Sequence, residues 1–131
     1  MWKIAAALML GLTGAATAEV QKAVVAGGCF WCVESDFEDV PGVLDAVSGY
    51  TGGTSQNPTY KDHEGHYEAV EITFDSAVIS YDDLISKFLR SVDVLDDGGQ
   101  FCDRGDAYRT AIFALDGAQR EWAEAEVAKA E

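Results

Sequence analysis

The cysteines are the residues of this sequence with the most evident chemistry. Two of them lie in the stretch "GGCFWC", at positions 29 and 32, and the third is Cys102. Cys29 follows the apolar run 20–26 and precedes a helix-forming stretch, which predicts its sulfur at a helix N-terminus. The free amides and the helix dipole at such an end favour a thiolate. We therefore predict that Cys29 is a reactive nucleophile rather than an inert buried thiol.

Other interpretations of the cysteines stay open at this point. A zinc site would need His63 or His66 as a fourth ligand, but the ligand spacing is irregular and only one CxxC is present. Covalent haem attachment is excluded because Val33 stands where that motif requires histidine. A thioredoxin-like dithiol of Cys29 and Cys32 is the strongest rival, since a CxxC after a strand is typical of that class.

Glu68 is the second residue whose position suggests chemistry. Residues 66–74 alternate as a strand does, and Glu68 falls on the same face as the apolar Val70, Ile72 and Phe74. Burial disfavours the charged form of a carboxyl group and raises its pKa. Glu68 is therefore a candidate general acid that keeps its proton near neutral pH.

The elements that must position these residues follow from the periodicity of apolar residues. One helix start is marked by Ser80 as a capping residue and by Asp82 and Asp83 in the first turn. The predicted order is strand, helix, strand, strand, helix, strand and helix, over residues 20–26, 30–40, 43–50, 66–74, 80–92, 108–115 and 117–131. We predict the α+β class, and within it a ferredoxin-like plait (βαββαβα) with a mixed or antiparallel sheet and helices packed on one face.

Composition limits the classes of partner. The chain has 131 residues, is 48% hydrophobic and carries a formal net charge of -14. That length and apolar content fit one globular domain. The negative charge repels phosphate backbones and anionic lipid headgroups, so nucleic acids and membrane surfaces are poor candidates as partners.

Residues 1–18 are predicted to be a secretory signal peptide. Lys3 supplies a basic start, residues 4–12 are apolar, and Ala16, Thr17 and Ala18 match the small residues that precede a cleavage site. The alternative is a membrane-anchoring helix, but the apolar run is shorter than the roughly 20 residues that span a bilayer. We expect a mature chain from Glu19 that is exported, to the periplasm or outside the cell, where cysteine pairs are readily oxidised.

Five segments together resemble the A-type peptide methionine sulfoxide reductases. They are "GGCFWCVESDFEDVPGVLDAVSGYTGG", "NPTY", "GHYEAVEITFD", "ISYDDLI" and "GGQFCDRGDAYRTAIF", and they occur in the family's order across residues 19–131. The resemblance implies the family's α+β fold and reduction of the S epimer of methionine sulfoxide, free or in proteins. It also implies recycling by an external dithiol of the thioredoxin type, with no bound cofactor.

The resemblance also assigns roles to individual residues. Cys29 matches the family's nucleophile and Glu68 its catalytic carboxyl group. Tyr60 and Tyr108 match the two tyrosines that hydrogen-bond the substrate oxygen. The resolving thiol, which would close a disulfide with Cys29, is either Cys102 or Cys32, and Cys102 is slightly favoured because it adjoins Asp103.

Three further residues match the family's substrate pocket. Phe30 and Trp31 correspond to the aromatic walls around the substrate methyl group, and Asp103 to the carboxylate that anchors the substrate backbone amide. Relatives continue beyond the last predicted helix, so we expect this chain to be shortened at its C-terminus. We expect a monomer, and keep two rival functions: a thioredoxin-like disulfide exchanger, and an inactive fragment that binds methionine-containing peptides.

Overall fold

A computed structural model describes residues 19–130 of the chain. The signal-peptide prediction for residues 1–18 concerns residues outside this range. None of the helices described is both long enough and apolar enough to cross a membrane.

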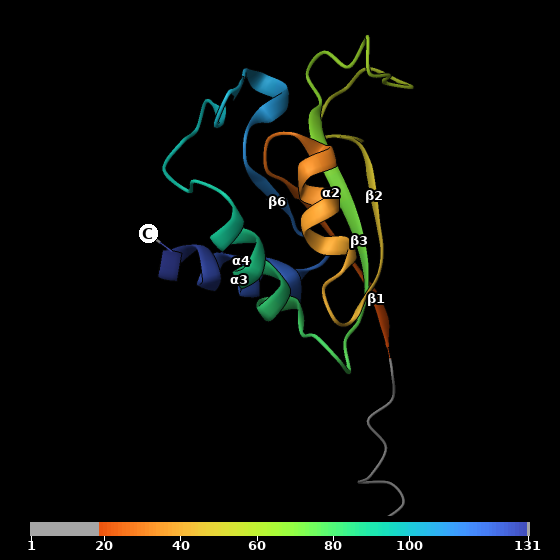
Figure 1. Ribbon diagram of the computed structural model, residues 1–131, viewed down its shortest axis with the longest axis vertical. Coiled ribbons are helices and arrows are strands. Elements are labelled where there is room, and N and C mark those ends of the chain that lie inside the picture. The colour runs from red at the N-terminus through yellow and green to blue at the C-terminus, as the bar shows by residue number, and fades with distance from the viewer. Residues whose placement is uncertain (1–18, 131) are drawn as a thin grey trace, which may run out of the picture.

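A four-stranded antiparallel sheet forms the centre of the fold (Figure 1). Its strands are β1 (Val20–Ala26), β2 (Val43–Thr51), β3 (Tyr67–Asp75) and β6 (Ala111–Phe113). Their order across the sheet is β2-β3-β1-β6, with each neighbouring pair antiparallel. The register places Val25 beside Val70 and Tyr50 beside Glu68. Because side chains alternate across a strand, these residues share one face of the sheet.

Three α-helices of residues 19–130 complete the core on that face. They are α2 (Phe30–Glu38), α3 (Tyr81–Ser91) and α4 (Gly117–Ala130). Helix α2 packs against β2 and β3, while α3 and α4 pack against each other (Figure 1). Their apolar residues join one cluster with those of the strands, including Phe37, Leu84, Phe88, Val70 and Ile72. The predicted α+β class, with an antiparallel sheet and packed helices, is therefore confirmed.

The start of α3 follows the local sequence as predicted. The Ser80 hydroxyl oxygen accepts a hydrogen bond from the Asp83 amide at 3.3 Å, which satisfies one of the free donors of the first turn. Helix α2 ends at Glu38, two residues before the predicted end at Val40. Pro41 and Gly42 follow, and Gly42 adopts a φ of +95° that favours glycine.

The last predicted strand, residues 108–115, is wrong in extent. Strand β6 covers Ala111–Phe113 alone, and Tyr108 lies in a 3₁₀ helix, η1 (Asp106–Tyr108). Strand β6 pairs with β1 only, and Ala111 lies opposite Ala26, the last residue of β1. Residues before Ala111 therefore have no strand to pair with, whatever their β propensity.

A short hairpin was not predicted. Strands β4 (Gly99–Gln100) and β5 (Asp103–Arg104) pair antiparallel, with Phe101 and Cys102 between them. Phe101 adopts a φ of +53°, which is rare for a bulky residue. Two-residue strands are too short to show a hydrophobic period, so no sequence pattern marked this element.

Candidate active site

The turn between β1 and α2 carries Cys29 at the N-cap position of the helix. Gly28 has a φ of +84°, and this turn takes the chain directly from strand to helix. The Cys32 and Val33 amides donate to the Cys29 carbonyl oxygen over 3.1 and 3.2 Å. Cys29 is half-buried and its side chain caps none of the helix amides. Cys29 is thus at the helix N-terminus, where the sequence predicts it.

The Glu68 carboxyl group is joined to the same helix start. Its Oε1 accepts a hydrogen bond from the Phe30 amide at 3.3 Å, and Phe30 is the residue after Cys29. Glu68 is 2% exposed, and its Oε2 has no hydrogen-bond partner among the described residues. Burial raises the pKa of Glu68, against the opposing effects of the Phe30 amide and His63. A buried carboxyl group that holds its proton is what a general acid needs.

The predicted aromatic residues gather on one side of this turn. Phe30 is buried, and its ring centroid lies 5.4 Å from that of Trp31 and 6.3 Å from that of Tyr60. Trp31 and Tyr60 stack at 5.3 Å with an angle of 16° between their planes, and Trp31 is 57% exposed. The three rings form an apolar surface beside Cys29 that is open to a substrate.

Tyr108 and Asp103 reach this region from the segment between α3 and β6. Burial raises the pKa of Tyr108, and the charges of Glu68, Asp103 and Cys29 raise it further. Such effects require these groups to lie near one another, since charge interactions fall with distance. The structure therefore places Tyr108 and Asp103 near Cys29 and Glu68.

The two candidate resolving cysteines differ in their surroundings. The Cys29 side chain has the largest of the effects that raise the pKa of Cys32 to about 11, followed by burial and nearby carboxylates. Cys32 is exposed and lies one turn along α2. Cys102 is exposed at the turn of the β4–β5 hairpin. Cys32 is thus the candidate that lies one helical turn from Cys29.

Sequence reasoning missed two aromatic residues of the site, Tyr50 and His63. Tyr50 faces Glu68 across β2 and β3, with its ring 5.3 Å from Phe30, and its buried hydroxyl group lacks a partner among residues 19–130. The alternation of β2 could have found Tyr50, because it shares a face with the buried Ala46. His63 stacks on Tyr50 at 4.7 Å, and was considered only as a metal ligand.

His66 has a structural role in the same loop. It is buried, its Nδ1 accepts a hydrogen bond from the Gly53 amide at 3.2 Å, and its Nε2 lies 2.9 Å from the Ser55 carbonyl oxygen. Both ring nitrogens are thereby used. Within residues 19–130, no group of three or more histidine, cysteine or acidic side chains is arranged to hold a metal ion.

Gln100 is a third residue that sequence reasoning missed, and it joins the hairpin to the Cys29 turn. It is 2% exposed, and its Oε1 accepts from the Asp93 amide at 2.8 Å. Its Nε2 donates to the Asp93 carbonyl oxygen and to Thr110 Oγ1, each at 2.9 Å. A Cβ atom at Gly28 would lie 2.7 Å from the Cβ of Gln100. The hairpin that carries Asp103 is therefore packed directly against the turn before Cys29.

This packing predicts a large effect of a small substitution. Gly28→Ala should lower the free energy of unfolding by about 1–3 kcal/mol, because alanine is strained at a positive φ and its methyl group would overlap Gln100. Urea denaturation measures the change. Gly117→Ala is the matched control, since nothing lies within 4 Å of its added methyl group, and it should change stability by less than about 0.5 kcal/mol. Equal midpoints for both variants would contradict this account of the turn.

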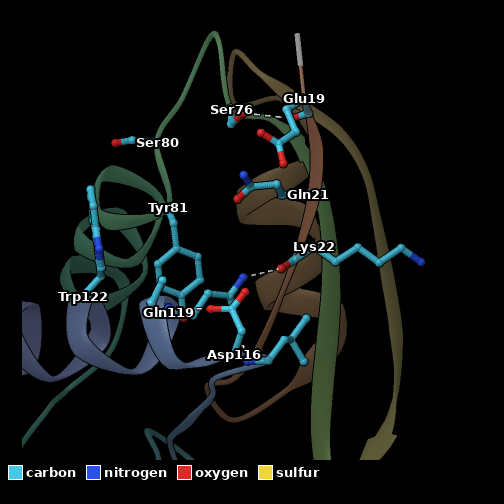
Figure 2. A pocket seen from close by; sticks show the side chains of 11 residues that line it. Glu19, Gln21, Lys22, Ser76, Ser80, Tyr81, Asp116, Gln119 and Trp122 are labelled. Atoms are coloured by element: carbon cyan, nitrogen blue, oxygen red, sulfur yellow. Dashed lines mark hydrogen bonds between the residues drawn. The ribbon is translucent and has the colours of Figure 1, made fainter. Parts of the chain in front are cut away.

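A cavity of about 470 Å³ lies elsewhere in the fold (Figure 2). Gln119 Nε2 donates to the Lys22 carbonyl oxygen at its edge, at 2.8 Å. Its lining includes Glu19, Gln21, Tyr81, Asp116, Gln119 and Trp122. Glu19 precedes β1, whereas Cys29 follows the end of β1. The cavity and the Cys29 site therefore lie at opposite ends of that strand.

Fold and site together define a class of protein: an α+β domain with a cysteine at a helix start and a buried carboxyl group beside it. Comparison with known proteins identifies the family. Residues 21–131 match the family described as "Peptide methionine sulfoxide reductase". The chain belongs to the peptide methionine sulfoxide reductase family.

Two relatives illustrate the match. The chain is 55% identical over 92% of its length to "Peptide methionine sulfoxide reductase MsrA 2" of Rhizobium meliloti, and covers 62% of that protein. It is 53% identical over 92% of its length to the protein of the same name from Caulobacter vibrioides, and covers 64% of it. The chain thus spans less than two thirds of the length of these relatives.

Solved structures agree with the fold. The methionine sulfoxide reductase A of Corynebacterium diphtheriae superposes with a TM-score of 0.81 at 28% identity, covering 87% of this chain and 57% of that one. The reduced form of Mxr1 from Saccharomyces cerevisiae gives a TM-score of 0.73 at 25% identity, with 86% of this chain and 66% of that chain covered.

Proposed function

We propose that the chain reduces methionine-S-sulfoxide, free or in proteins, to methionine. The observation that carries this proposal is the hydrogen bond from the Phe30 amide to Glu68 Oε1 at 3.3 Å. It holds the buried carboxyl group of β3 against the residue that follows Cys29, so that the proposed nucleophile and acid lie side by side.

The first chemical step would transfer the substrate oxygen to Cys29. The thiolate attacks the sulfoxide sulfur while Glu68 gives its proton to the sulfoxide oxygen, which makes that oxygen a better leaving group. The sulfur–oxygen bond of the substrate and the transient bond between the two sulfurs break, and the oxygen, with the proton from Glu68, bonds to the Cys29 sulfur. The substrate leaves as methionine, and Cys29 becomes a sulfenic acid. The substrate gains two electrons and the cysteine sulfur loses two.

The surrounding side chains suit this step. Phe30, Trp31 and Tyr60 offer an apolar surface for the methyl group of the substrate. The hydroxyl groups of Tyr60 and Tyr108 would hydrogen-bond the substrate oxygen and stabilise its developing charge. Asp103 would accept a hydrogen bond from the substrate backbone amide.

The second step would form a disulfide and release water. The place of Cys32, one turn along α2 from Cys29, favours Cys32 as the resolving thiol over Cys102. The Cys32 thiol loses its proton and attacks the sulfenic sulfur, and the hydroxyl group leaves as water. An external dithiol of the thioredoxin type would then reduce the disulfide, and we propose no bound cofactor.

Disulfide mapping tests this assignment. After one turnover without reductant, peptide mass spectrometry should find the Cys29–Cys32 bond in the wild type and in Cys102→Ser. Cys32→Ser should stop at the sulfenic acid, which dimedone traps. A Cys29–Cys102 bond in the wild type would show that Cys102 resolves the intermediate, as the sequence alone slightly favoured.

Turnover of the two sulfoxide epimers tests the function itself. With dithiothreitol as reductant, the S epimer of a blocked methionine sulfoxide should be consumed and the R epimer left. A disulfide exchanger would instead reduce insulin disulfides and leave both epimers, and an inactive binding fragment would do neither. Family membership favours the first outcome.

The proposal also includes the detailed fold type, the export of the chain and its oligomeric state. The strand order β2-β3-β1-β6 supports a ferredoxin-like plait. Export of the chain rests on the composition of residues 1–18 alone. We further propose that the exported chain acts as a monomer on oxidised methionine residues of other proteins.

A further inference from the structure

Beside the start of β1 lies the Tyr81 cavity, the space of about 470 Å³ whose lining includes Glu19, Gln21, Tyr81, Asp116, Gln119 and Trp122. Tyr81 is the first residue of α3 and is 7% exposed, and its Oη has no hydrogen-bond partner among residues 19–130. Its ring points from the start of α3 toward Gln119 and Asp116 (Figure 2). Buried hydroxyl groups are normally hydrogen-bonded in folded proteins. The unpaired hydroxyl group therefore indicates that a further polar group belongs in this cavity.

Two neutral polar side chains of the lining are already used within the fold. Gln119 donates from Nε2 to the Lys22 carbonyl oxygen at 2.8 Å, and its Oε1 accepts from the Leu115 amide at 3.0 Å. The Ser76 hydroxyl group donates to the Glu19 carbonyl oxygen at 3.0 Å. These bonds join β1 to α4 and to the turn after β3. The two side chains therefore hold the walls of the cavity together and are less available to a ligand than its acidic groups.

The acidic groups of the lining are two carboxylates, which accept hydrogen bonds and carry negative charge. Asp116 Oδ1 accepts from the Gln119 amide at 2.8 Å and so caps the first turn of α4. A carboxylate offers about four acceptor positions, so Asp116 can still accept from a ligand. Glu19 brings the second carboxylate and is an exposed residue. A ligand that matches both groups must donate hydrogen bonds and carry positive charge.

The lysine of the lining does not neutralise these carboxylates. Lys22 is the only basic residue among the described residues that line the cavity. Its Nζ lies 3.0 Å from Glu71 Oε1, and its side chain extends away from Tyr81 (Figure 2). The cavity is thus left acidic, and the formal net charge of -14 adds to the attraction of a cation.

Trp122 adds an aromatic face to the same cavity. It lies on α4 and is 47% exposed. Leu115, just before this helix, is 53% exposed and adds apolar surface to the lining. The face of an indole ring attracts cations, and its body packs against aliphatic chains. Carboxylates beside an exposed indole ring suit a cation that is carried on an apolar stem.

We propose that the Tyr81 cavity binds an organic cation, an ammonium or guanidinium group on an apolar stem. The charged head would lie between the carboxylates of Glu19 and Asp116, with one N–H donating to Tyr81 Oη and the stem along Trp122. The hydroxyl group of Tyr81 stays neutral, because burial and the charge of Asp116 raise its pKa to about 12. This site is separate from the proposed reductase site, since the cavity and Cys29 lie at opposite ends of β1.

The first test is an NMR titration with n-butylguanidinium. The sequence has three tryptophans, so Trp122→Phe assigns the indole N–H signal of Trp122. This signal should shift and saturate, with a Kd of about 1 mM or below for a ligand of this size. The neutral 1-pentanol and the anionic pentanoate are the matched controls and should leave the signal in place. The absence of a saturable shift, or equal shifts with all three compounds, would overturn the proposal.

The second test removes the two charges of the site. Asp116→Asn and Glu19→Gln should each weaken binding by about two- to fivefold, the range for partly exposed charge pairs. Asparagine is also a preferred N-cap residue, so Asp116→Asn should keep the start of α4. Glu38→Gln is the matched control: it removes the same charge from the exposed end of α2, outside the cavity, and should leave the Kd unchanged. Equal weakening in all three variants would show attraction to net charge alone and reject the site.

The third test removes the unpaired hydroxyl group. Tyr81→Phe should weaken binding about tenfold, as expected for a hydrogen bond to a charged group. Without ligand, Tyr81→Phe should be at least as stable as the wild type in urea, because the buried hydroxyl group has no partner to lose. Binding that is unchanged in Tyr81→Phe, in Asp116→Asn and in Glu19→Gln would place the ligand elsewhere and overturn the proposal.

Two further probes distinguish the sources of such a cation. Spermidine represents free polyamines, and acetylarginine methylamide represents a basic side chain of another protein. Tighter binding of either probe supports the cation site and assigns its source, whereas binding of neither probe would reject both sources and the proposal with them. Sulfoxide turnover by Asp116→Asn should equal that of the wild type, so failure of the reductase and failure of this site can be told apart.

Discussion

Replacing Cys29 with serine is expected to abolish sulfoxide reduction, by at least about 1,000-fold, because a serine hydroxyl stays protonated and cannot replace the activated thiolate. Cys29 occupies an N-cap position, and its side chain makes no capping hydrogen bond. Serine is among the preferred N-cap residues. Cys29→Ser should therefore be at least as stable as the wild type, so that loss of folding cannot explain loss of activity.

Paired measurements check this expectation. Loss of the S epimer of a methionine sulfoxide peptide, followed by chromatography, gives the rate, and urea denaturation gives the stability. Cys102→Ser is the matched control, because it removes a thiol from the exposed hairpin turn and should keep a measurable first turnover. Residual activity of Cys29→Ser within tenfold of the wild type would rule out Cys29 as the nucleophile.

Glu68→Gln should give the second largest loss, about 100- to 10,000-fold in the rate of the first turnover, the range expected for loss of a general acid. Glutamine has the shape of glutamate, and its amide oxygen can still accept the Phe30 hydrogen bond. The variant has no titratable proton at position 68. Its residual rate should therefore not show the fall at high pH that loss of the Glu68 proton causes in the wild type. Stopped single-turnover assays across the pH range measure both effects.

Glu68→Gln should lower the rate of the reaction but raise the stability of the fold at alkaline pH. Burial raises the pKa of Glu68 in the folded protein, so between its unfolded and folded pKa values the folded state binds more protons than the unfolded state. Stability then falls as the pH rises through this interval. Glu68→Gln removes this dependence and should be more stable than the wild type at alkaline pH. A wild type that gains stability relative to Glu68→Gln as the pH rises would contradict the burial argument.

Most of the sheet and its helices follow from local sequence patterns. Strands β1 and β3 and helix α3 have clear apolar periods, and the Ser80 cap is where the sequence placed it. The extent of β6 could not be predicted, because it depends on where its partner β1 ends. The ends of a strand depend on the partner strand with which it pairs, and the sequence of the strand itself does not indicate where that partner ends.

In the candidate active site, too, some residues could be predicted from local sequence and others could not. Glu68 was predictable because a carboxylate interrupts an apolar face, and it is indeed buried on β3. The contact of Tyr60 with Trp31 depends on the path of the loop between β2 and β3. The role of Gln100 could not be predicted, because no sequence pattern marks a buried amide in a loop. Only the three hydrogen bonds of its side chain in the folded protein reveal that role.

The side-chain amide of Gln100 also determines how the candidate site would unfold locally. It bonds Asp93 and Thr110, and its aliphatic part rests on Gly28. A fluctuation that frees the hairpin must break all of these contacts together, which makes the exit of α3, the hairpin and the Cys29 turn one cooperative unit of local unfolding. Asp103, the proposed substrate anchor, and Cys29, the proposed nucleophile, would thus be displaced and restored in a single event. Partially assembled sites, with Cys29 exposed and Asp103 out of place, would be rare, and this arrangement would shield the Cys29 sulfur from side reactions.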